Sequence, residues 1–397
     1  MQTLLIIAVL ALGAPTAEPD TTGATVAQPS LIAAPLIPDS PISDSTSPGS
    51  TADDTALLPA PQTATLDDLL RMPPALREAF HQQVLDHHRA PTDRIETMVD
   101  FVFSAAGMGM RYDESATYTV AQSWEQRRAN CIGFTLLFLA LSREAGLSAR
   151  PQEIRQTLIW QQSGTTLYRN SHVNLRLQAG PRRYTVDVAR DLVIALDEPI
   201  AINDQRLLAH YQNNIAIKQM AQGQIGAALA RIEATLRLDP DYAIHWGNAG
   251  VIRLRSGDEG GAEHAYLRAL ELDPDEYGTL FNLVQLYDSR GAAAMAAPLR
   301  ERMESLQKKD PLYQFLLATR FEREGDFTQA IEHYQQAIRH HRDEHRFHAA
   351  LARAYLASGD RDGAERALAR AKSLSDGEAE ASYAAELAQL RGVPGNG

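Results

Sequence analysis

Apolar residues occupy every side of a helix between Phe134 and Leu141, which is typical of a helix buried all round. Gly146 is expected to end this helix, because glycine readily takes the left-handed conformation that follows a last helical turn. Asn130 suits the N-cap position, where its side chain can accept from the free N–H groups of the first turn. The pattern therefore predicts a buried helix that begins at Cys131, at the positive end of the helix dipole, which favours a thiolate.

Two later segments alternate between apolar and polar positions, as half-buried strands do. In Ser171–Gln178 one face carries His172 and Asn174, and in Arg183–Ala189 one face carries Asp187. The stretch AGPR between them is a turn. If the connecting loop has an even number of residues, His172 and Asp187 share a face and lie opposite or diagonal to each other. An odd loop without a bulge would separate them.

The second half of the chain repeats itself. The endings LDPDY, LDPDEY and KDPLY close at Tyr242, Tyr277 and Tyr313, at spacings of 35 and 36 residues. Between them, Gly-Asp is followed by alanines and by apolar positions at three- and four-residue steps. Gly-Asp gives a tight turn, and alanine lets paired helices approach closely. This pattern predicts four or five helix pairs over about residues 208–374.

The first residues, MQTLLIIAVLALGA, favour a secretory signal cleaved near Ala14 or Ala17, although no Lys or Arg precedes Arg71. Residues 18–64 are rich in Pro, Ser, Thr and Ala and have too few large apolar side chains to fold, so we expect a flexible tether. We therefore predict export to the periplasm. A cytoplasmic chain with a chance apolar run is the alternative.

The composition of the chain excludes several kinds of site and partner. A net charge of -12 disfavours nucleic acid, and no later segment is long and apolar enough to span a membrane. One cysteine excludes an internal disulfide and any multi-cysteine metal site. Four histidines lie close together without a recognisable spacing of further ligands, so we expect no metal there: His340, His341, His345 and His348.

Small residues recur at matching places in three copies: Gly257, Ala262, Ala269 and Pro274; Gly325, Ala330 and Ala337; Gly359, Ala364 and Ala371. These copies resemble tetratricopeptide repeats, and the copy at Gly278–Tyr313 is degraded. The resemblance implies an all-α solenoid over residues 206–390 whose concave face binds a peptide or protein. The alternative is that the repeats only brace the neighbouring domain.

A cysteine that starts a buried helix, a histidine in an HVN strand and an aspartate in YTVD follow one another in this order. They resemble the transglutaminase-like superfamily of papain-like cysteine enzymes, over roughly residues 95–193, with Ala129 where many relatives have glycine. The resemblance implies an α+β domain at residues 65–205 that needs no cofactor. It also implies that Cys131 attacks an amide carbonyl, His172 takes and returns the proton, and Asp187 orients the imidazole.

The oxyanion donor is open between several groups. The backbone N–H of Cys131 is the first candidate, and Gln122, Trp124 or Asn174 are the side-chain candidates. Three function classes follow: an enzyme that hydrolyses an amide of a peptide or protein, a transamidase that joins the acyl group to an amine, and an inactive protein-binding scaffold. Hydrolysis is favoured over transamidation because water is always available.

Overall fold

The computed structural model describes residues 4–7, 64–155, 160–163, 166–169, 172–188 and 198–392. The chain forms two compact units, Met1–Gly291 and Ala292–Gly397. Except for residues 4–7, the expected signal segment (1–17) lies outside the described residues. So does the expected tether (18–64), except for Ala64.

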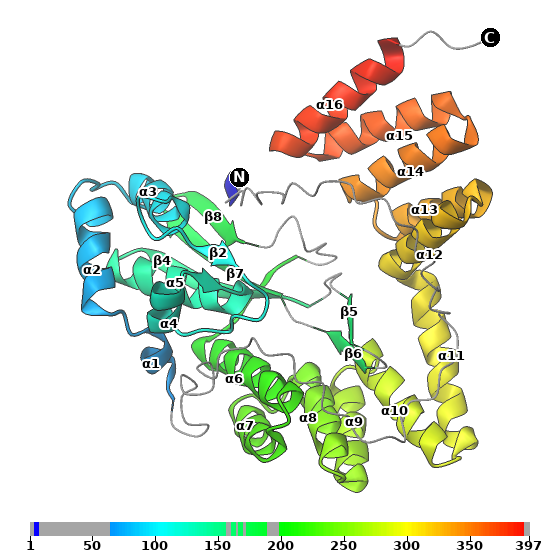
Figure 1. Ribbon diagram of the computed structural model, residues 1–397, viewed down its shortest axis with the longest axis horizontal. Helices are drawn as coiled ribbons and strands as arrows, with labels where there is room; N and C mark the ends of the chain where they lie inside the picture. Colours follow the sequence, from blue (N-terminus) through cyan, green and yellow to red (C-terminus); the bar gives the residue numbers. More distant parts are fainter. Residues whose placement is uncertain are drawn as a thin grey trace, which may run out of the picture. The chain divides into compact units, whose positions relative to one another are not determined.

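The first unit contains a five-stranded sheet with the strand order β1-β8-β7-β4-β9 (Figure 1). Its strands are β1 (Leu4–Ile7), β4 (Ser148–Ile154), β7 (His172–Ala179), β8 (Arg182–Asp187) and β9 (Ile200–Ala201). β1 pairs with β8 in parallel, and the other neighbours are antiparallel. Two smaller sheets pair β2 (Arg111–Tyr112) with β3 (Arg128–Ala129) and β5 (Trp160–Ser163) with β6 (Thr166–Arg169).

The predicted central helix is α5 (Cys131–Glu144), which packs on β7 and β4. Every residue from 132 to 142 is buried, as the all-round apolar pattern predicts. Asn130 is the N-cap and accepts a 3.0 Å hydrogen bond from the Gly133 N–H, and Gly146 takes a φ of 68° just beyond the last turn. The predicted start and end of this helix are confirmed.

The other helices of the N-terminal part cover α5 and one face of the sheet. They are α1 (Leu66–Leu70), α2 (Pro74–Phe80), the π-helical turn η1 (His81–Leu85), α3 (Pro91–Phe103) and α4 (Val120–Gln126). Their apolar side chains join those of α5, β7 and β8 in one core, which also takes in Leu207, Leu208 and Tyr211 of the following helix. The core therefore continues from the sheet into the helical part of the chain.

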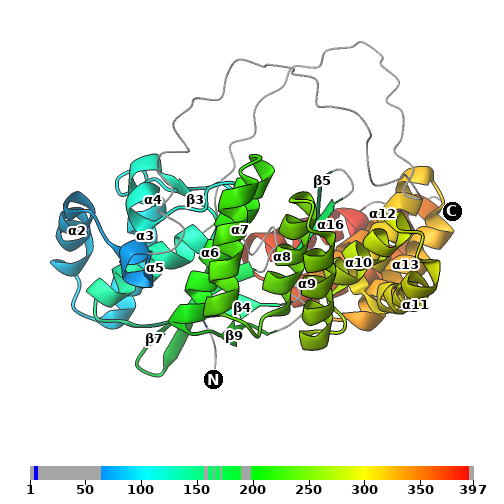
Figure 2. The same cartoon turned by 90° about the horizontal axis from the view of Figure 1, so that it is seen from below.

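Five helices complete the first unit: α6 (Asp204–Ala221), α7 (Ile225–Leu238), α8 (Ala243–Arg255), α9 (Glu259–Leu272) and α10 (Tyr277–Ser289). α6 to α9 lie side by side in chain order (Figure 2). Because α6 shares the core with the sheet, the predicted domain boundary between residues 205 and 206 falls inside this compact unit.

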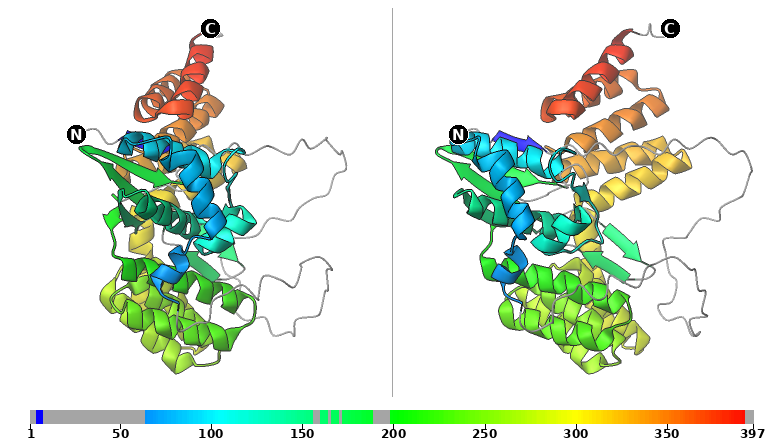
Figure 3. Two further views of the ribbon diagram at one scale, coloured as in Figure 1. Left: turned by 90° about the vertical axis from the view of Figure 1, so that its left-hand side faces the viewer. Right: turned by 60° about the vertical axis from the view of Figure 1, so that its left-hand side comes forward.

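The second unit is helical: α11 (Ala293–Lys309), α12 (Pro311–Glu324), α13 (Phe327–His340), α14 (His345–Ser358), α15 (Arg361–Leu374) and α16 (Gly377–Gly392). From α12 onward each helix packs against the next (Figure 3). α11 lies in the degraded copy, contains Pro298 and buries only Ala296 and Met303 among its residues.

The turns between paired helices show why Gly-Asp recurs in the sequence. Glycines with positive φ recur every 34 residues, at Gly223, Gly257, Gly291, Gly325 and Gly359. The aspartate that follows three of them caps the next helix, as Asp360 does by accepting from the Gly363 N–H at 2.8 Å. The glycine ends one helix of a pair, and the aspartate caps the N-terminus of the other. The period holds through the degraded copy.

Within the described residues, we find no helix with the length and hydropathy that a membrane span requires.

Candidate functional site

The half-buried Cys131 lies at the N-terminus of α5, held there by a loop that packs on the first turn. Asn130 donates from Nδ2 to Thr117 Oγ1 at 2.8 Å, and its N–H donates to the Ala116 carbonyl at 2.9 Å. A Cβ on Gly133 would meet Ala129 Cβ at 2.9 Å, so only glycine fits without a shift there. The first-turn N–H groups have no carbonyl within the helix, which makes this tip electropositive.

His172 and Asp187 form a buried pair next to this tip. The β7–β8 turn consists of Gly180 and Pro181, an even count, so both side chains lie on one face as predicted. In the register of the two strands, Asp187 faces Asn174 and is diagonal to His172. His172 Nε2 lies 2.8 Å from Asp187 Oδ1 and 2.9 Å from Oδ2, with side-chain exposures of 2% and 10%.

The electrostatic surroundings of His172 favour its charged form. Burial lowers the pKa of His172, but the negative charge of Asp187 and hydrogen bonds to Asp187 and Cys131 outweigh burial and raise the pKa to about 10. Since Nε2 faces Asp187, Nδ1 is the nitrogen left for the sulfur of Cys131. The structure thus brings the three predicted catalytic residues together.

Each of the three predicted oxyanion side chains has a contact in the free protein. Gln122 caps its own helix, since its Oε1 accepts from the Thr119 N–H at 3.0 Å. Trp124 lies under the Arg127 guanidinium, 3.8 Å from the ring centroid. Asn174 donates from Nδ2 to Asp187 Oδ2 at 3.0 Å. The contact of Asn174 occupies an N–H donor, whereas those of Gln122 and Trp124 do not involve one, so the backbone N–H of Cys131 and these three side chains stay predictions.

Tyr112 is a further side chain at the site that the sequence pattern did not indicate. It lies on β2, opposite Ala129 of β3, two residues before the cysteine. Burial raises the pKa of Tyr112, and negative charge on Cys131, Glu114 and Asp187 raises it further. The phenol stays protonated and can donate a hydrogen bond beside the sulfur. A two-residue strand has no periodicity, so the sequence carries no signal for this placement.

Mostly apolar side chains of α5, β7 and β8 lie next to the sulfur of Cys131. A gap beside Cys131 that is too small for a water molecule is lined mainly by residues of α5, β7 and β8: Phe134, Thr135, Phe138, Val173, Leu175, Val186 and Val188. Thr135 donates to the Cys131 carbonyl at 2.8 Å and so satisfies its own hydroxyl. Because these side chains are apolar, the local dielectric constant is low, and the electrostatic interaction between His172 and Asp187 is stronger.

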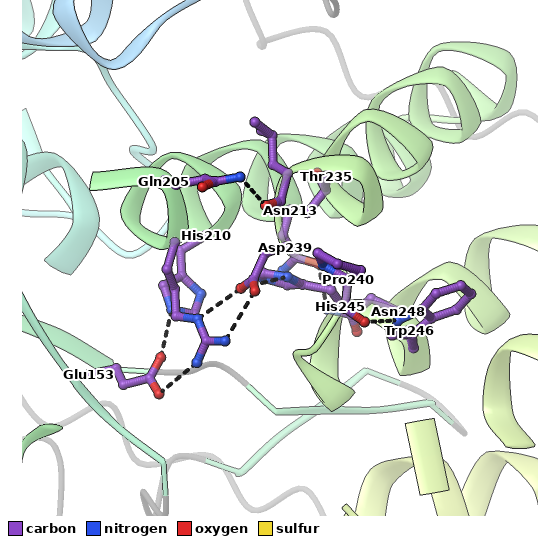
Figure 4. Close-up of polar contacts among 12 residues, drawn as sticks. Glu153, Gln205, His210, Asn213, Thr235, Asp239, Pro240, His245, Trp246 and Asn248 are labelled. Atoms are coloured by element: carbon purple, nitrogen blue, oxygen red, sulfur yellow. Dashed lines mark hydrogen bonds and ion pairs between the residues drawn. The ribbon is translucent and has the colours of Figure 1, made fainter. Parts of the chain in front are cut away.

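A second buried polar cluster lies where β4 meets the first repeat helices (Figure 4). Glu153 of β4 has a fully buried side chain and lies 3.1 Å from His210 Nε2 and 2.8 Å from Arg155 Nε. Burial would raise the pKa of Glu153, but hydrogen bonds from His210 and Arg155 and the charge of Arg206 lower it to about 2. Sequence analysis missed this cluster.

Asp239 and His245 complete the cluster. Arg206 donates to both Asp239 oxygens, at 2.9 and 3.0 Å, while His245 Nδ1 lies 3.7 Å from Asp239 Oδ2, too far for a hydrogen bond. Burial, together with the nearby His210 and Arg206, lowers the pKa of His245 well below its ordinary value. An adjacent cavity of about 200 Å³ is lined by the same ion pairs. Because its carboxylates and guanidiniums are paired, the cluster fastens β4 to α6 and α7.

Two of the four histidines near the α13–α14 turn form hydrogen bonds with protein groups. His345 lies 3.0 Å from the Tyr383 hydroxyl, and His348 Nε2 donates to the Arg342 carbonyl at 2.9 Å. Across the described ranges, no three His, Cys, Asp or Glu side chains are placed to share a metal ion.

Comparison with protein families identifies the helical part of the chain. Models of the tetratricopeptide repeat match residues 214–299 and residues 322–390. The chain therefore contains tetratricopeptide repeats, which confirms the repeats predicted from Gly-Asp and its alanines. These repeats support binding of a protein partner.

Individual relatives resemble parts of the chain. The Photosystem I assembly protein Ycf3 of Prochlorococcus marinus strain MIT 9303 is 27% identical over 125 residues, which are 31% of this chain and 70% of that protein. Its counterpart in Prochlorococcus marinus strain MIT 9211 is 27% identical over 109 residues, 27% of this chain and 62% of that protein.

Among solved structures, the chain is similar to YrrB, a TPR protein with an unusual peptide-binding site, at 18% identity and a TM-score of 0.24, covering 45% of this chain and 92% of that one. It is also similar to a thermophilic TPR protein of Thermus thermophilus, at 19% identity and a TM-score of 0.25, covering 45% and 99%. The family matches lie in the repeats, and they favour a protein-binding scaffold over an enzyme.

Proposed function

We propose that the chain is a protein-binding tetratricopeptide protein whose first unit also carries a transglutaminase-like cysteine site. The repeats support the binding part of the proposal. The catalytic part rests on one observation, the buried His172–Asp187 pair beside a cysteine at a helix N-terminus. The residue types, their order and their geometry together match the needs of nucleophilic catalysis at an amide.

The proposed reaction has two steps. The Cys131 thiolate attacks the amide carbonyl carbon and forms a carbon–sulfur bond, and the carbonyl oxygen takes the negative charge. His172 gives its proton to the departing amine as the carbon–nitrogen bond breaks, which leaves a thioester on Cys131. Water then attacks the thioester, His172 takes the proton, and the acid and the thiolate are released. Asp187 holds the imidazole throughout.

Two donors are available for the oxyanion. The backbone N–H of Cys131 is free of intrahelical bonds because it lies in the first turn, and the phenol of Tyr112 is a donor whose raised pKa keeps it protonated. An amine in place of water would leave an isopeptide bond instead of an acid. Released acid with no new isopeptide bond is the expected product, because water is always present.

An inactive scaffold is the second candidate function, and the family matches favour it. In that case Cys131 is a half-buried core thiol and the His172–Asp187 pair serves stability alone. Both candidates share the repeats, so they differ only in the reactivity of one sulfur.

Alkylation of Cys131 by iodoacetamide at pH 6, followed by mass analysis, separates the two candidates. An imidazolium-paired thiolate should react at least about tenfold faster than a free thiol at this pH, and His172→Ala should remove the advantage. His81→Ala, which replaces a half-exposed histidine bonded to Glu144, is the matched control and should react like the wild type. A wild-type rate no faster than that of a free thiol would favour the scaffold.

We further propose that the chain is exported, on the strength of its apolar first residues. Fractionation of cells that express the full-length chain tests this. Recovery of a shortened chain from the periplasm is the expected result, and recovery of the full-length chain from the cytoplasm would contradict it.

A further inference from the structure

Asn174 lies at the centre of the catalytic sheet and is almost completely buried, with 2% of its surface exposed. It is in the middle of β7, opposite Gln152 of β4 on one side and opposite Asp187 of β8 on the other. Side chains two apart on a strand share a face, so Asn174 and His172 both point to the face that carries Asp187.

Two nitrogen donors lie against the same oxygen of Asp187. Oδ2 lies 2.9 Å from His172 Nε2 and 3.0 Å from Asn174 Nδ2, while Oδ1 lies 2.8 Å from His172 Nε2. The amide of Asn174 restrains Oδ2 from a second direction and so sets the plane in which Asp187 meets the imidazole.

The bond to Asp187 determines which way the Asn174 amide faces. Turning the amide over would bring Oδ1 against a carboxylate oxygen, so Nδ2 must face Asp187. The consequence is that Oδ1 is buried and receives no hydrogen bond from the part of the chain that the structure describes. A buried acceptor without a donor destabilises the fold. The bond to Asp187 is thus kept at a cost in stability, as is common where a residue serves a site.

We propose that Asn174 is a positioning residue of the cysteine site, which acts through Asp187 to hold His172 in register with Cys131. This inference rests on the proposed catalytic function, and it goes beyond the predicted role of Asn174 as an oxyanion donor. It gives the amide a fixed partner in the free protein, whereas an oxyanion donor meets its partner only during the reaction.

A double-mutant cycle on full-length protein tests the proposal, with the iodoacetamide rate at Cys131 as the readout. Asn174→Leu should lower the rate at pH 6 about tenfold, the size expected for one charge-assisted hydrogen bond. In an Asp187→Asn background the same change should alter the rate by less than about twofold, because its route of action is already lost. If Asn174→Leu does not fold, the smaller Asn174→Ala takes its place.

A further readout, with a matched control, separates positioning from a structural role. The iodoacetamide rate should depend on pH differently in Asn174→Leu and in the wild type, because Asp187 no longer holds the imidazolium of His172 in place. Among the described residues, Tyr112 and Cys131 also interact electrostatically with this pair, and both are unchanged in this variant. Asn213→Leu is the matched control, because Asn213 is buried and accepts a 3.0 Å bond from Asn248 in the repeats; it should leave the profile unchanged.

Three outcomes would overturn the inference. The first is a wild-type-like rate for Asn174→Leu when wild-type Cys131 is fast, which would leave the proposed function standing. The second is an equal loss with and without Asp187, which would mean that Asn174 acts by another route. The third is a wild-type Cys131 no faster than a free thiol, which would remove the proposed function and this inference together.

Discussion

His172 and His245 are both buried histidines near an aspartate, yet the pKa of His172 is raised and the pKa of His245 is lowered. At the tip of α5, Asp187 contacts the ring of His172 at 2.8 Å and the pKa rises to about 10. At the junction of β4 with the repeats, the Asp239 carboxylate is held by Arg206, His245 is 3.7 Å away, and its pKa falls. Both rings are buried, so the difference in pKa comes from the aspartate. The carboxylate of Asp187 contacts His172, whereas that of Asp239 is bonded to Arg206.

The difference separates a site that can do chemistry from one that joins two parts of the fold. At the tip of α5, the raised pKa keeps His172 protonated next to the half-buried sulfur of Cys131. The second cluster satisfies its charges internally and has a fully buried carboxylate at its centre. Four predictions test this contrast, from the largest expected effect to the smallest.

The largest effect on stability is expected at the junction. Glu153→Gln removes the charge that His210, Arg155 and Arg206 share, and we expect a loss of about 3 kcal/mol in the free energy of unfolding. Urea unfolding at pH 7 measures it. Glu271→Gln removes one half of an exposed pair with Arg268 and should change stability by less than about 0.5 kcal/mol. Equal losses for the two variants would contradict a structural role for the junction.

The acid side of the stability profile should depend on His245. Because the pKa of His245 is lowered, its protonation in the unfolded chain destabilises the fold as the pH falls below the ordinary value of 6.5. Replacing it with the similarly shaped phenylalanine, His245→Phe, should flatten the loss of unfolding free energy between about pH 6.5 and 5. An unchanged acid slope in this variant would show that His245 is not the group responsible.

The free energy of unfolding at alkaline pH should depend on His172, with a sign opposite to that for His245. Because its pKa is raised, its contribution to stability is complete below 6.5 and is lost as the pH rises toward 10. His172→Gln should therefore be less stable than the wild type at pH 6 and closer to it at pH 10. Measuring both proteins by urea unfolding at the two pH values is sufficient, and a constant difference would contradict the ion pair.

The smallest change removes a single hydroxyl at the α5 tip. Tyr112→Phe should leave the iodoacetamide rate within about twofold, because alkylation forms no oxyanion. Acylation of Cys131 by p-nitrophenyl acetate, which does form one, should fall about tenfold. The phenol is not an oxyanion donor if both rates are unchanged, and it acts on the sulfur itself if both fall together.

Local patterns predicted the elements that carry the site. The N-cap at Asn130 and the glycine beyond α5 each depend on a few neighbouring residues, and both are present. The repeats were predicted for the same reason, since Gly-Asp encodes a glycine C-cap and an aspartate N-cap side by side. The sequence left the parity of the β7–β8 turn open, and the structure shows that it is even.

Contacts between distant segments escaped prediction. Glu153 and His210 are 57 residues apart, and nothing near either one indicates the other. Tyr112 reaches the site from a strand of two residues, too short for any alternation to be visible. Asn174 was placed on the correct face, but its partner depends on the register of β7 against β8, which is fixed only when the hairpin forms.

The charge of His172 is the central claim, and its titration in the full-length protein tests it most directly. The ring 13Cε1 and 1Hε1 shifts of His172, assigned by comparison with His172→Gln, can be followed by NMR from pH 5 to pH 11. We expect a ring that stays protonated through pH 8 and titrates near 10. A ring that is neutral at pH 7 would contradict it, because no imidazolium would then be present to stabilise a thiolate on Cys131.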